Sequence, residues 1–158
     1  MSGTWPTFRA ALKAQLNGVT VDLGASYDAE TMMALEYAAP GRQDASNWPY
    51  CVVLPEGRHL TRESGGDRVT TVPVTVLVML APFGASDNQE YLQQRYDAWC
   101  DALSDALDDA ISMDGTSDIA AHVQDFGRLE QIMSVDEGWG FELILPEVQI
   151  SEAKTFSA

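Results

Sequence analysis

The chain of 158 residues is poor in cysteine, in basic residues and in long apolar runs. Its two cysteines, Cys51 and Cys100, are too few and too isolated for a disulfide framework or a zinc site. Each lies in an apolar pattern that is typical of a buried free thiol, so we expect a reducing compartment. Residues 1–6 lack a basic segment followed by an apolar one, which predicts no signal peptide. The longest apolar stretch, Val72–Ala81, is too short to span a bilayer as a helix, which favours a soluble intracellular protein.

The shortage of basic residues leaves a large negative charge. Lys and Arg total 9 against 24 Asp and Glu, a formal net charge of -15. Non-specific binding to nucleic acid needs a positive surface, as does binding to an anionic membrane, so both classes of partner are disfavoured. Hydrophobic residues make up 46% of the chain and charged ones 21%, which is ordinary for a globular domain of this length.

The first third of the chain predicts one helix, one strand and a segment of uncertain type. Apolar residues at helical spacing predict a helix over Phe8–Leu16, which Asn17-Gly18 would end. Alternating residues predict a short strand over Val19–Leu23. Asp28–Ala38 is compatible with a second helix or with an ordered loop, so we treat residues 26–48 as a possible insertion of either kind.

The middle of the chain carries the strongest strand signals. Tyr50–Leu54 predicts a buried strand, and Arg58–Glu63 and Arg68–Leu80 flank a Gly-Gly pair that favours a tight hairpin. Because Pro73 cannot donate to a strand ladder, it should lie at an edge or a bulge. Leu77 and Met79 suggest that the second face of this strand is covered as well. The first face carries Val72, Val74, Val76, Val78 and Leu80, which we expect in the core.

A long amphipathic helix is predicted over Asp87–Ser112, where Ser86 and Gln89 form a capping-box pattern. Its apolar stripe consists of Leu92, Tyr96, Trp99, Leu103, Leu107 and Ala110. Strand-like sequence follows from His122 to Val135 and ends at a turn over residues 136–138. The last strand carries Trp139, Phe141, Leu143 and Leu145 on one side and continues through Val148 and Ile150.

These elements predict a single α+β domain over residues 1–158. We expect a mainly antiparallel sheet, with the long helix and the N-terminal helix packed on one face, because the strands are grouped along the chain. Residues 152–158 are expected to form a flexible tail.

The helix face opposite the apolar stripe carries Asp97, Asp101, Asp105 and Asp108. Calcium needs six to eight oxygens in a curved shell, which a straight stripe does not provide, so no metal site is expected. A solvated helix face is the ordinary interpretation. However, like charges one turn apart each oppose the helix by about 0.2–0.5 kcal/mol. This cost raises the hypothesis that the acidic face is a pore wall or contacts a basic partner.

No arrangement of residues predicts catalysis or cofactor binding. His59 and His122 have no adjacent nucleophile and carboxylate, and neither a nucleophile elbow nor a phosphate-binding loop occurs. We therefore expect no enzyme activity, no cofactor and no catalytic residues.

Three of the nine basic residues, Arg58, Arg62 and Arg68, flank the predicted Gly-Gly hairpin. They either protect a sheet edge or form a subunit contact in which this basic hairpin meets the acidic helix of a neighbouring copy. Among the tryptophans, Trp5, Trp99 and Trp139 are core candidates, whereas Trp48 could anchor a partner.

The order of elements resembles that of a known family. An amphipathic N-terminal helix precedes the strand WPYCVVLPEGR and a polar hairpin, and TTVPVTVLVML then leads into the helix YLQQRYDAWCDALSDAL. The chain closes on the strand GWGFELILPEVQIS. This arrangement resembles the tail terminator, or tail completion, proteins of long-tailed bacteriophages, the lambda minor-tail-protein-U-like group.

The resemblance implies a virion protein that forms a hexameric ring at the head-proximal end of the tail tube. Its partners would be further copies of itself, the tube protein and the head–tail connector, and DNA would pass through without being recognised by sequence. Two alternatives stay open. One is a head-completion or connector protein of the same particle, and the other is an acidic inhibitor that mimics DNA.

Overall fold

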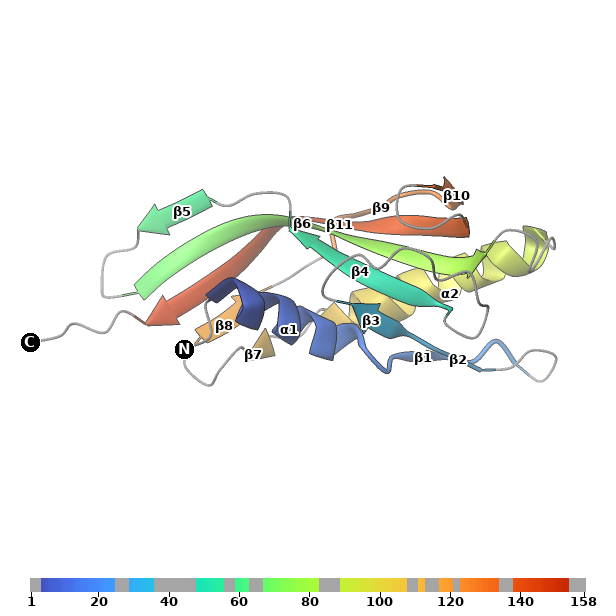
Figure 1. Ribbon diagram of the computed structural model, residues 1–158, viewed down its shortest axis with the longest axis horizontal. Helices are drawn as coiled ribbons and strands as arrows, with labels where there is room; N and C mark the ends of the chain where they lie inside the picture. Colours follow the sequence, from blue (N-terminus) through green and yellow to red (C-terminus); the bar gives the residue numbers. More distant parts are fainter. Residues whose placement is uncertain are drawn as a thin grey trace, which may run out of the picture.

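The computed structural model describes residues 4–24, 29–35, 48–55, 59–62, 67–82, 89–107, 111–112, 117–120, 123–133 and 138–153 (Figure 1). Within these residues the helices are α1 (Thr4–Leu16) and α2 (Gln89–Leu107). The strands are β1 (Thr20–Val21), β2 (Glu30–Thr31), β3 (Met33–Leu35), β4 (Tyr50–Pro55), β5 (His59–Arg62), β6 (Asp67–Pro82), β7 (Ile111–Ser112), β8 (Ser117–Ala120), β9 (Asp125–Phe126), β10 (Glu130–Ile132) and β11 (Gly138–Ala153). The chain is therefore α+β, as the sequence predicts.

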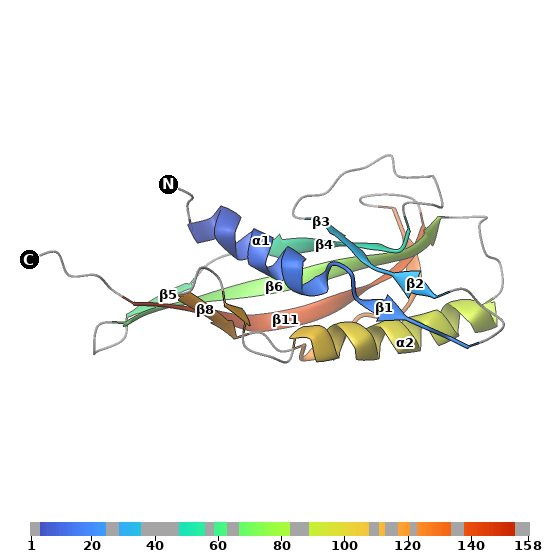
Figure 2. The same ribbon diagram turned by 90° about the horizontal axis from the view of Figure 1, so that it is seen from below.

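Two long antiparallel strands, β6 and β11, form the centre of the sheet (Figures 1 and 2). In the described residues the strand order is β3-β4-β6-β11-β8-β7, and only the β3–β4 pair is parallel. Strand β5 pairs with the first part of β6, so the hairpin predicted around the Gly-Gly pair is confirmed for its two arms. On the far side, β8, β9 and β10 pair with successive parts of β11.

A bulge divides the β6–β11 pair into two halves. Val74 lies opposite Leu145 and Val72 lies opposite Val148, so the register shifts between them. Pro73 sits at this shift, and it also falls between the last pair of β4 with β6 and the first pair of β5 with β6. The prediction that Pro73 lies at a bulge is confirmed, because a residue without an N–H is tolerated where the ladder is interrupted.

The bulge also explains why the buried residues of β11 change from odd to even sequence positions along the strand. Phe141, Leu143 and Leu145 are buried at odd positions, whereas Val148 and Ile150 are buried at even ones. Side chains alternate between faces with a period of two, so a strand without the bulge would turn one of these sets to the other face.

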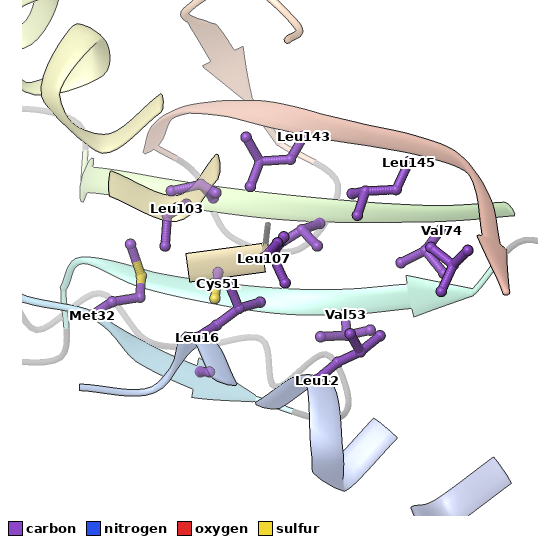
Figure 3. Packing of buried hydrophobic residues seen from close by; sticks show 14 of the residues in the cluster. Leu12, Leu16, Met32, Cys51, Val53, Val74, Leu103, Leu107, Leu143 and Leu145 are labelled. Atoms are coloured by element: carbon purple, nitrogen blue, oxygen red, sulfur yellow. The ribbon is translucent and has the colours of Figure 1, made fainter. Parts of the chain in front are cut away.

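The main core joins both helices to the sheet (Figure 3). The N–H of Asn17 donates to the carbonyl of Lys13 at 2.8 Å and Gly18 has a φ of 86°, which confirms the predicted end of α1. Side-chain Nε2 of Gln15 on α1 donates to the carbonyl of Ala106 on α2 at 2.6 Å. The buried cluster includes Phe8, Leu12, Leu16, Cys51, Val53, Val74, Val76, Trp99, Leu103, Leu107, Leu143 and Leu145.

A second, smaller cluster covers the other face of β4 and β6. Leu77 is 3% exposed and Met79 is fully buried, which confirms that this face is covered too. They pack with Tyr50, Val52 and Ile132. The sheet is thus apolar on both faces where these strands lie.

The helix considered for Asp28–Ala38 is wrong in the part that the structure describes. Residues 30–31 and 33–35 form β2 and β3 instead, and residues 25–28 and 36–47 lie outside the described residues. The reason is tertiary, because β3 pairs with β4 and the side-chain Oδ1 of Asn17 accepts the N–H of Ala34 at 3.0 Å. These contacts override a helical spacing that is weak on its own.

Two other boundaries also differ from the prediction. The strand expected over Val19–Leu23 is reduced to Thr20–Val21, which pairs with β2. The long helix ends at Leu107 in the described residues, and Ile111–Ser112 form β7, because Ile111 pairs with Ile119 of β8. Of the strand-like segment from His122 to Val135, residues 125–126 and 130–132 form β9 and β10.

Candidate functional surfaces

The acidic face of α2 points away from the core. Asp97, Asp101 and Asp105 are all exposed, and Asp108 lies outside the described residues. On the opposite side Leu92, Trp99, Leu103 and Leu107 are fully buried against the sheet, with Arg95 at 5% exposure among them. Within the described part of the chain, no ion pair involves the three aspartates. The negative charge of this face is therefore compensated by no described cation.

The described arms of the basic hairpin, β5 and the start of β6, lie at the other end of the molecule. Arg62 of β5 and Arg68 of β6 occupy directly opposite register positions, and Arg58 lies outside the described residues. Glu152 of β11 is the register partner of Arg68 on its other side. Figures 1 and 2 place β5 at one end of the long axis and α2 in the other half.

A buried polar network ties α2 to β2. Arg95 donates to Glu30 through Nε at 2.9 Å and through a terminal nitrogen at 2.5 Å, and it also donates to the carbonyl of Leu80 at 2.7 Å. Trp99 donates its indole N–H to the same carboxylate at 3.1 Å. The Arg95 and Glu30 side chains are only 6% and 14% exposed, and the Tyr91 ring lies 5.4 Å from the guanidinium carbon. A bidentate pair of this kind fixes one arrangement of the two elements.

The sequence interpretation missed this network. The available signal was the position of Arg95, which lies three residues after Leu92 and four before Trp99, within the apolar stripe. A cation in such a stripe needs a buried anion, but the sequence does not show which carboxylate supplies it.

The two cysteines are buried and free, as expected. Burial raises the pKa of Cys51 to about 12 and that of Cys100 to about 11, although a hydrogen bond with Tyr96 lowers the latter in part. Burial likewise raises the pKa of Tyr96 to about 12, and its hydroxyl donates to the carbonyl of Gly127 at 2.9 Å. The thiolate is the nucleophile, so neither thiol suits covalent chemistry near neutral pH.

We therefore expect the native protein at pH 8 to resist alkylation by iodoacetamide, because almost no thiolate forms below these pKa values. Mass spectrometry after timed labelling measures the effect. The same protein unfolded in urea is the control and should take up two labels. Labelling of folded protein as fast as unfolded protein would contradict the burial of both thiols.

The remaining positions singled out in the sequence are His59, His122 and Trp48. His59 lies in β5, whereas His122 is outside the described residues. Trp48 is half-buried, with its ring 5.0 Å from that of Tyr50 and close to Gly138, so it is part of the second cluster. The described residues contain no group of three or more possible metal ligands. Neither described helix has the length and apolarity needed to cross a membrane.

Comparisons with known proteins assign no family. No protein-family model matches the chain, and no curated protein is similar to it.

Proposed function

We propose that the chain is a ring-forming tail terminator of a long-tailed bacteriophage, as its resemblance to the lambda minor-tail-protein-U-like group implies. In this role the ring caps the tail tube and offers the surface on which the head connector docks. Its partners are further copies of itself, the tube protein and the connector. The site of action is the tail of the virion, after assembly in the host cytoplasm.

The observation that carries the proposal is the separation of two opposite charges on one elongated molecule. Strand β5 and the start of β6, the arms of the basic hairpin, lie at one end, and α2, which carries the exposed aspartates, lies in the other half (Figure 2). Two surfaces so far apart do not meet within one chain, but in a ring they can meet between neighbouring chains. A contact between two different surfaces propagates head to tail, and it closes into a ring when the rotation permits.

The acidic surface is unfavourable in an isolated chain. Aspartates one turn apart destabilise a helix, as at Asp97, Asp101 and Asp105. A neighbour that brings basic residues against this surface would relieve that cost.

The net charge of -15 also suits a channel for DNA. A negatively charged wall repels the phosphate backbone, so the duplex would pass without adhering to it. No base-specific contact is required.

Neutralising two aspartates is expected to weaken the ring. We predict that the wild-type protein has a solution mass near six subunits by light scattering, and that the mass falls at high salt. D101N/D105N should lower the mass at a salt concentration where the wild type stays assembled, because both residues belong to the exposed acidic face.

The matched control is A10K/A14K, which changes the net charge by the same amount at exposed positions of α1. This variant should assemble like the wild type. Equal losses in both double variants would show that net charge, rather than the acidic face, controls assembly. A monomer at every concentration that competes with DNA for a basic protein would instead support the DNA-mimic alternative. A ring that fails to bind the end of a tail tube would support the connector alternative.

A further inference from the structure

We draw no further inference here: the strongest candidate, the patch of half-buried apolar side chains that Met33 and Leu35 of β3 and Leu54 of β4 form against the second cluster, carries nothing because nothing in the structure shows what covers it.

Discussion

Replacing Arg95 with methionine is expected to lower the free energy of unfolding by about 3–5 kcal/mol, because the Glu30 carboxylate would stay buried without its cation. The substitution also removes the donor to the Leu80 carbonyl. Urea denaturation followed by tryptophan fluorescence measures the change. Because Trp99, one of four tryptophans, donates to the same carboxylate, its contribution to the emission should change with the loss of order around Glu30.

A double-mutant cycle separates the ion pair from simple packing. E30L/R95M replaces both charges by apolar groups and should recover much of the lost stability, because the cost arises from the unpaired charge. The control is Arg128→Met, which removes an exposed pair and should cost less than about 1 kcal/mol. If Arg95→Met cost no more than Arg128→Met, the network would not hold β2 against α2.

Gly140→Ala is expected to destabilise the protein by about 1–3 kcal/mol through overpacking. A Cβ at this position would meet the carbonyl oxygen of Val78 closer than real Cβ atoms come, with the Met79 sulfur at 3.0 Å. Gly140 does not have a positive φ, so the cost is steric and not conformational. The β6–β11 register shifts next to this residue, and the strands would have to separate to admit the methyl group.

Gly127→Ala is the matched control, since its nearest neighbour would be the Glu142 backbone nitrogen at 3.2 Å. Urea denaturation should show a change below about 1 kcal/mol for Gly127→Ala. Equal midpoints for Gly140→Ala and the wild type would mean that the two strands approach less closely than described.

Local sequence patterns correctly predicted the elements of the fold that depend on residues close together in the chain. Turn chemistry and alternation gave the β5–β6 hairpin, and the missing N–H of Pro73 gave the bulge. The stripe on α2 predicted which side is buried and therefore that Asp97, Asp101 and Asp105 are exposed.

The sequence predictions were wrong where contacts between residues far apart in the chain determine the structure. Residues 30–35 contain Met32 and Leu35 at a spacing that also suits a helix, but pairing with β4 and the Glu30–Arg95 contact select strands. The residue that pairs with Arg95 lies far away in the sequence, so only the tertiary structure identifies it.

The pairing of β6 with β11 has a consequence for how the protein folds. Its register joins Pro82 to Gly138 at the near end and Asp67 to Ala153 at the far end, so all of α2 and the short strands after it lie inside the closed loop. Such long-range closure is slow, whereas the β5–β6 hairpin needs only local contacts. The hairpin should thus form before β11 pairs with β6. Until then the long apolar strand β6 is unpaired on its β11 side. In that interval, which ends only when β11 docks, the chain is most exposed to aggregation.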